Sequence, residues 1–318
     1  MIQKIIFNPL IYIIYVALLF NAHPSSGQEA WGPDDQRGAA NYITEAKVVQ
    51  TAKLITEGKI YHLGHVYEEN MPTGGGTFKF GVIGSGPADP PRSAVFNDDF
   101  FAGDIGHIGT QFDAFGHAGY RGDGPMEDDE FYNGFKGSEV YSSNGLLNLG
   151  VEKARPFFTR GVLIDVAECK GVERLEPGYE ITPEDLKASL RKQGISIKEG
   201  DVVLVRTGHS KLWDSNRDAY YDWSAEPGLG VPAASWLTDQ KVVIIGSDNF
   251  GIEVIPFSKG ATRWPVHLLC LKDRGVHLLE SMDLESLHED RVYEFAFMFS
   301  PLPIKGGTGS PGNPIAVK

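Results

Sequence analysis

GHIGTQFDAFGHAGY, at residues 106–120, gathers polar and ionisable side chains between closely spaced glycines. Four of its side chains can bind a metal ion or move a proton, namely His107, Gln111, Asp113 and His117. In an extended strand all four would share one face, yet His107 and Asp113 would lie roughly 20 Å apart at ~3.3 Å per residue. Because metal–ligand bonds are only about 2 Å long, a shared site requires a curled loop, and Gly106, Gly109 and Gly116 supply the backbone freedom for one. A glycine-rich surface loop with solvated polar side chains is the alternative.

Residues 1–27 are typical of a signal peptide. Lys4 precedes an apolar run from Leu10 to Phe20, which fits a signal h-region and falls short of the ~20 residues that span a bilayer. Cleavage after Ala22 or Gly27 fits the preference for small residues, and an uncleaved anchor is the alternative. We therefore expect residues 28–318 to form the mature protein, exported to a periplasm or outside the cell.

Composition narrows the class of protein. A net charge of −13 without Lys/Arg clusters argues against nucleic acid and anionic membrane surfaces as partners. By length alone the mature chain could form one large domain or two small ones, and 42% hydrophobic residues supply ample material for a core. Because the sequence has no internal repeat and no composition break, we expect a single domain. The two cysteines, Cys169 and Cys270, could pair in an oxidising compartment, but two buried free thiols are the favoured interpretation.

The first part of the mature chain predicts one helix, one strand and a long irregular segment. Thr44–Glu57 has helical spacing, with Thr44 as the N-cap and Gly58 after its end. Ile60–Val66 follows as a strand, and about forty residues rich in Gly and Pro then indicate strands joined by long loops. His62 and His65 lie three residues apart, on opposite faces of a strand, so we interpret both as structural.

The second part alternates strands and helices. Apolar runs predict buried strands at Gly161–Asp165, Val202–Val205 and Val242–Ile245, and a helix is predicted from Thr182 to Gly194. This pattern is typical of an α/β domain, in which ligands usually bind beyond the carboxyl ends of the strands.

The segment from Trp264 to Glu280 predicts a helix that begins at Pro265 and ends at Gly275, followed by a strand. His267 would lie in the first turn and Glu280 at the end of the strand, so a hairpin could bring them to one edge of a sheet. From the residues alone His267 is most simply an ordinary histidine. We further expect a core strand at Tyr293–Phe299 and a loop-like tail from Gly306.

Two histidines, two carboxylates and an amide suffice for a hydrolytic site with one or two metal ions. A divalent ion lowers the pKa of its bound water from ~16 to roughly 7 and polarises a substrate carbonyl. A further histidine can then pass a proton to the leaving group, and His117 is the candidate for this role.

The pattern His107-x-Gly109-Thr110-x-x-Asp113-x-x-x-His117, with His267 and Glu280 far downstream, resembles the cyclase-like metal hydrolase family, which includes bacterial kynurenine formamidase and isatin hydrolase. The segments WGPDDQRGAANYIT, GDVVLVRTG, SDNFGIEVIP and FMFSPLPIKGGTGSP also look typical of its members. The resemblance implies a single compact α/β domain with mixed sheets, of the swivelling β/β/α type, often assembled as dimers or tetramers. It implies zinc or manganese as the metal, His117 as the general acid/base, and four metal ligands, namely His107, Asp113, His267 and Glu280.

Gln111 departs from the family pattern, because the better-characterised hydrolases have a metal-binding histidine at this position. The change leaves three consequences open: one metal ion instead of two, a preference for manganese, or a hydrogen bond from Gln111 to the substrate. We expect a metal-bound hydroxide to cleave an amide, cyclic amide, lactone or ester of a small aromatic molecule. The alternatives are a metal-assisted cyclisation or dehydration at the same site, and an exported metal or small-molecule carrier without catalysis.

Overall fold

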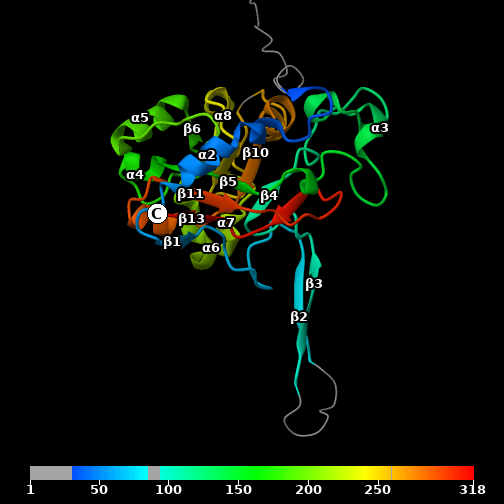
Figure 1. Cartoon of the computed structure of the whole chain (residues 1–318), viewed down its shortest axis with the longest axis horizontal. Coiled ribbons are helices and arrows are strands. Elements are labelled where there is room, and N and C mark those ends of the chain that lie inside the picture. Colours follow the sequence, from blue (N-terminus) through cyan, green and yellow to red (C-terminus); the bar gives the residue numbers. More distant parts are fainter. Residues whose placement is uncertain (1–30, 85–93, 259) are drawn as a thin grey trace, which may run out of the picture.

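The computed structural model describes residues 31–84, 94–258 and 260–318, so the segment interpreted as a signal peptide lies outside the described residues. A nine-stranded mixed sheet forms its centre, with the strand order β1-β13-β11-β5-β7-β9-β10-β4-β12 (Figure 1). Its strands are β1 (Ile60–His62), β4 (Gln111–Asp113), β5 (Phe157–Asp165), β7 (Val202–Arg206), β9 (Ile244–Ser247), β10 (His277–Glu280), β11 (Glu294–Phe299), β12 (Gly309–Pro311) and β13 (Ile315–Val317). The expected α/β fold with mixed sheets is confirmed.

The four central strands, β5, β7, β9 and β10, are parallel, and the flanking strands pair antiparallel. Helical segments connect the parallel strands, so both faces of the central sheet are covered, and the apolar runs in β5, β7 and β9 are buried. The helices are α2 (Glu45–Ala52), α3 (Gly137–Val140), α4 (Val166–Lys170), α5 (Pro183–Gln193), α6 (Leu212–Ser215), α7 (Arg217–Tyr220), α8 (Val231–Asp239), α9 (Pro265–His267) and α10 (Glu285–Glu289).

Helix α5 has the expected ends. The Thr182 hydroxyl accepts a hydrogen bond from the Asp185 backbone N–H, the Asp185 carboxylate accepts one from the Thr182 N–H, and Gly194 ends the helix with a φ of 69°. The predicted helix after Pro265 also ends at Gly275, but α9 passes into a π-helix over Leu268–Arg274. The expected strand at Tyr293–Phe299 is β11, with Phe295, Phe297 and Phe299 buried.

Two early elements are shorter than predicted. Helix α2 begins after its Thr44 cap as expected but ends at Ala52 rather than Glu57, because the backbone N–H groups of Glu57 and Gly58 donate to the carbonyl of Lys318. Strand β1 spans only three residues because its neighbour β13 is equally short.

The prediction of a loop-like tail is wrong. Residues from Gly306 onward contain β12, which pairs with β4, and β13, which lies between β1 and β11. Three-residue strands between glycines and prolines carry no local period, so only their tertiary pairing defines them. Both cysteines are free as expected, although only Cys270 is fully buried and Cys169 is half-buried.

Two small sheets lie outside the main one. Strands β6 (Glu180–Ile181) and β8 (Gly228–Leu229) pair in parallel, and β2 (Phe78–Gly84) and β3 (Asn97–Gly103) form an antiparallel hairpin. The hairpin lies within the segment predicted to hold strands and long loops, and it projects well away from the body of the molecule (Figure 1). Within the described ranges, no helix has both the length and the apolar character needed to cross a bilayer.

Candidate metal centre

The stretch from His107 to His117 curls as its chemistry requires. A turn at His107, whose backbone N–H donates to the carbonyl of Asp104 (2.9 Å), leads into β4, and a second turn joins the N–H of His117 to the carbonyl of Ala114 (3.0 Å). The curl brings the rings of His107 and His117 into a stack with centroids 4.1 Å apart. Residues that an extended strand would hold far apart therefore share one site.

Two glycines permit this curl for different reasons. Gly109 has a φ of 60°, and a Cβ there would lie 2.8 Å from the Tyr67 ring. Gly116 lacks a positive φ, but a Cβ there would lie 2.3 Å from a methyl carbon of Leu146. The expectation that Gly106 and Gly116 act through backbone freedom is wrong, because neither has a positive φ. Of the three glycines, only Gly109 combines a positive φ with a close contact to its Cβ position.

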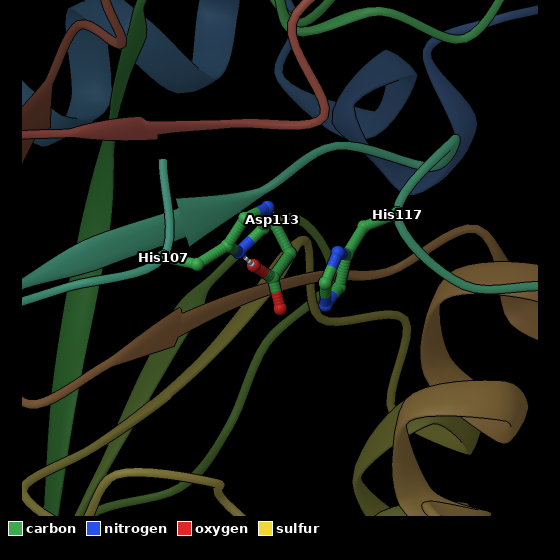
Figure 2. A group of neighbouring side chains, drawn as sticks. All are labelled: His107, Asp113 and His117. Carbon is green, nitrogen blue, oxygen red and sulfur yellow. Dashed lines mark ion pairs between the residues drawn. The ribbon is translucent and has the colours of Figure 1, made fainter. Parts of the chain in front are cut away.

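Asp113 is the central member of the site. It ends β4, is fully buried, and places one carboxylate oxygen 3.5 Å from Nδ1 of His107 and the other 3.7 Å from Nε2 of His267. Figure 2 shows the side chains of His107, Asp113 and His117 pointing toward one another. Among the described residues neither oxygen of Asp113 has a hydrogen-bond partner. Burying such a carboxylate is costly unless an ion or a hydrogen bond compensates it.

The distant pair predicted from the sequence joins Asp113. Glu280 ends β10 directly opposite Gln111 of β4, and His267 lies at the end of α9. The Nε2 atom of His267 lies 3.1 Å from a carboxylate oxygen of Glu280. The helix-turn-strand hairpin therefore brings both residues to one edge of the sheet, as its sequence suggested.

These side chains form two overlapping groups that could hold a metal ion. His107, Asp113 and His117 form one group, and Asp113, His267 and Glu280 form the other, with the ligand atoms of each within 4.8 Å of one another. Buried ligand atoms at Asp113, Glu280 and Nδ1 of His107 have no hydrogen-bond partner within the part of the chain that is described. The residues present therefore fit a divalent ion. His117 belongs to the first group, so its position is compatible with both a ligand and a proton carrier.

Two residues that the sequence did not single out orient the histidines. An oxygen of Glu253 lies 2.6 Å from Nδ1 of His267, and the Thr308 hydroxyl lies 2.8 Å from Nε2 of His107. When each of these ring nitrogens carries the proton, the other nitrogen of the ring offers its lone pair to the centre beside Asp113. Glu253 lies in the quoted segment SDNFGIEVIP, but only the folded structure brings it to His267.

Gln111 is buried beside the two groups. Its amide nitrogen donates a hydrogen bond to Glu280, and its amide oxygen has no partner within the described ranges. Gln111 therefore contacts a candidate ligand directly.

The charges around the centre separate the roles of the side chains. Burial lowers the pKa of His117 to about 4, despite the opposing effect of Asp113, so its ring is neutral at pH 7. Burial and the nearby Asp113 carboxylate raise the pKa of Glu280. Burial also raises the pKa of Asp113, but the nearby His117, His107 and His267 outweigh this effect and hold the pKa at about 2. A neutral imidazole beside an ionised carboxylate can accept a proton.

A cavity of about 480 Å³ opens at His117. Aromatic and cationic side chains line it together with the histidine, among them Arg121, Phe131, Tyr141, Arg263 and Trp264. The ring of Trp264 also meets that of His267 edge-on, with centroids 5.1 Å apart. The cavity therefore joins the candidate metal centre to a partly apolar space of the size that small molecules occupy.

The other predicted polar positions have structural roles. His65 is stacked on Trp213 with centroids 4.0 Å apart, and His62 contacts Asn313, in agreement with the structural interpretation of both histidines. After β7, Arg206 is fully buried and forms ion pairs with Asp165 and Glu285.

A sequence profile of the Cyclase family matches residues 61–254, more than half of the chain. A solved structure described as a novel cyclase is 33% identical, with a TM-score of 0.80 over 93% of this chain and 99% of that chain. Isatin hydrolase A from Ralstonia solanacearum (21% identity, TM-score 0.59) and an isatin hydrolase bound to the product analogue thioisatinate (22%, 0.58) are also similar, each over 86% of this chain and 98% of theirs. No curated protein matches the chain. The profile and the 33% identity over nearly the whole chain establish that this protein belongs to the Cyclase family.

Proposed function

We propose that this protein is a metal-dependent hydrolase that cleaves an amide, cyclic amide, lactone or ester bond in a small aromatic molecule. The observation that carries the proposal is the fully buried Asp113 carboxylate, free of hydrogen bonds within the described residues and adjacent to the neutral His117 at the end of a cavity. The fold is shared with isatin hydrolases, and isatin is itself a small aromatic cyclic amide, which supports the choice of substrate class.

We assign the metal to Asp113, His267, Glu280 and His107, whose nitrogen and oxygen donors suit zinc or manganese. A bound divalent ion would activate a water molecule and polarise the scissile carbonyl. The hydrogen bond from Gln111 to Glu280 favours a role for this amide in restraining a ligand of a single ion.

His117 moves the proton in the proposed reaction. Its neutral ring can accept a proton at nitrogen from the attacking water and return it to the leaving nitrogen or oxygen. Trp264 and Phe131 offer aromatic surfaces to the substrate, and Arg121 and Arg263 can hold the carboxylate that hydrolysis of any of these bonds releases.

Turnover and metal content, measured together, test the proposal. Purified protein loaded with Zn²⁺ or Mn²⁺ is incubated with aryl lactones, N-formyl arylamines and isatin, and products are separated by chromatography. His117→Ala should lower turnover by at least about 100-fold while metal content stays unchanged. His62→Ala, a histidine outside the site, is the matched control and should retain full activity.

Each contrary outcome has a distinct meaning. Loss of metal from His117→Ala would make this residue a ligand instead of a proton carrier. Tight metal binding without turnover of any panel member would favour the carrier alternative, and a cyclised product would favour the cyclase alternative. Export is proposed from residues 1–27 alone, and N-terminal sequencing of protein recovered outside the cytoplasm tests it.

A further inference from the structure

We propose that the substrate carries a carboxylate of its own, on the far side of an aromatic ring from the bond that is cleaved, and that Arg263 and Arg121 bind this carboxylate. The assignment rests on the proposed function, because it names the substrate class for the same cavity. It places a negative charge on the substrate before hydrolysis, in addition to the carboxylate that hydrolysis releases.

Two arginines from different segments line the cavity that opens at His117. Arg121 follows His117 by four residues, and Arg263 immediately precedes Trp264. Arg263 is exposed, and it forms no hydrogen bond or ion pair with any residue that the structure describes. Its planar guanidinium is therefore available to bind both oxygens of a carboxylate.

A buried acid holds the other arginine in place. The Nε atom of Arg121 lies 3.6 Å from Oδ1 of Asp129, whose exposed fraction is 5%. Asp129 is itself fixed, because its carboxylate accepts hydrogen bonds from the Gly122 backbone N–H (3.0 Å) and from the Tyr141 hydroxyl (3.0 Å). Both terminal Nη groups of Arg121 remain without a partner among the described residues, so they can donate to a ligand.

The lining of the cavity matches one negative charge. Its charged side chains are Arg121, Arg263 and Asp129, and the ring of His117 is neutral at pH 7, which leaves one net positive charge. This local excess stands out in a chain whose net charge is −13. A single carboxylate complements such a lining better than a doubly charged phosphate does.

The arginines lie at the outer end of the cavity. The side chain of Arg121 is 70% exposed, whereas Asp113 is fully buried. A scissile carbonyl has to reach the metal ligands beside Asp113, so the carboxylate that hydrolysis forms arises at the inner end. The outer end is therefore open to a second acidic group of the substrate.

Aromatic walls join the two ends. At the inner end the ring of Trp264 meets that of His267, with centroids 5.1 Å apart. At the outer end Tyr141 is tied to Asp129, and its ring lines the cavity together with Phe131. A substrate with a carbonyl at one end, an aromatic ring in the middle and a carboxylate at the other end thus meets matching groups along the whole cavity.

Two matched esters test the assignment. The compounds meta-acetoxybenzoate and meta-acetoxybenzamide share the ring and the scissile ester and differ in charge, and hydrolysis of either releases acetate and a phenol that keeps its ring substituent. Metal-loaded wild type should hydrolyse the benzoate with a kcat/KM about 10-fold above that of the benzamide. Arg263→Gln should lower kcat/KM for the benzoate about 10-fold, mainly through KM, and change that for the benzamide by less than about 2-fold.

Arg191→Gln is the matched control. Arg191 lies in the last turn of α5, is exposed and does not line the cavity, so this variant removes the same charge elsewhere and should keep the preference for the benzoate. Loss of the preference in both variants would show an effect of net charge alone and would overturn the assignment.

Calorimetric titration with meta-hydroxybenzoate separates binding from turnover. Metal-loaded wild type should bind this probe more tightly than meta-hydroxybenzamide, and Arg263→Gln should weaken its binding about 10-fold. Equal affinity in wild type and Arg263→Gln would place the carboxylate on the metal and overturn the assignment. If neither ester is hydrolysed but binding of the probe depends on Arg263, the hydrolase proposal fails and the carboxylate site stands. Hydrolysis of both esters with equal kcat/KM in wild type keeps the hydrolase and refutes the carboxylate site.

Discussion

Replacing Glu253 with glutamine should weaken metal binding although Glu253 is not a predicted ligand. One oxygen of Glu253 lies 2.6 Å from Nδ1 of His267 and accepts the backbone N–H of the same residue (3.2 Å), and the other accepts the N–H of Val266 (3.1 Å). Glutamine keeps one acceptor but turns its amide N–H₂ toward one of these donors. The His267 ring then loses the negative charge that fixes its orientation.

The magnitude follows from this geometry. Loss of a partner that orients a metal-binding histidine typically lowers metal affinity by about 10- to 100-fold, which corresponds to about 1.4–2.8 kcal/mol. Because the glutamine N–H₂ then faces another N–H donor, one buried donor is left without an acceptor. This costs about 1–3 kcal/mol of folding free energy. Titration of Zn²⁺ or Mn²⁺ against a competing chelator, well below the melting temperature, measures the first effect, and urea unfolding of metal-free protein measures the second.

Glu226→Gln is the matched control for Glu253→Gln. Glu226 is equally buried and also accepts two backbone N–H groups, from Phe250 and Gly251, but within the described residues it forms no hydrogen bond or ion pair with His267. Burial raises its pKa well above the ordinary value, so glutamine is a close match for its uncharged form. Equal metal affinity in wild type and Glu253→Gln would refute the orienting role, and equal losses in both glutamine variants would show only a general effect of replacing a buried glutamate.

Three further predictions concern the loop, the amide and the pH dependence of stability. Gln111→His should raise the number of metal ions per chain, measured by atomic absorption, because it supplies an imidazole beside Glu280; unchanged content would show that the amide does not limit metal binding. A left-handed backbone costs a residue with a side chain about 1–2 kcal/mol. Gly109→Ala should lower the free energy of unfolding in urea by more than this, since its Cβ also meets Tyr67. Gly194→Ala has a similar φ and open space at its Cβ, so equal losses in the two variants would rule out the contact. Because burial raises the folded pKa of Glu226, its contribution to stability is complete below the unfolded pKa of about 4.3 and is lost as pH rises. Urea unfolding should therefore show Glu226→Gln gaining stability over wild type with increasing pH, and a gain that instead grows as pH falls contradicts this sign.

The sequence predicted what local pattern encodes. Caps and apolar periods identified α5, β5 and β7, and the close spacing of His107, Asp113 and His117 was enough to require a curl. His267 and Glu280 could be proposed because a proline, a glycine and an apolar run surround them. Their proximity to Asp113 is a property of the sheet, in which β10 lies between β9 and β4.

Contacts between distant segments could not be predicted in the same way. Thr308 reaches His107 only because β12, which follows it, pairs with β4, and three-residue strands leave no sequence period. The segment around β2 and β3 was predicted to hold strands joined by long loops, but its glycines and prolines did not indicate that the two strands pair in a hairpin that projects from the body.

The backbone beside the site departs further from what sequence can indicate. Ile252, Trp264 and Ser281 all have positive φ values, of 60°, 55° and 49°. Ile252 immediately precedes Glu253, and Ser281 immediately follows Glu280. A left-handed conformation costs roughly 1–2 kcal/mol for a residue with a side chain, and for a β-branched residue it is a genuine outlier. Strain of this kind persists only where the surrounding structure enforces it. The packed sheet and its loops thus hold Glu253 and Glu280 in place through the backbone, so we expect the donor atoms to be positioned before a metal ion arrives.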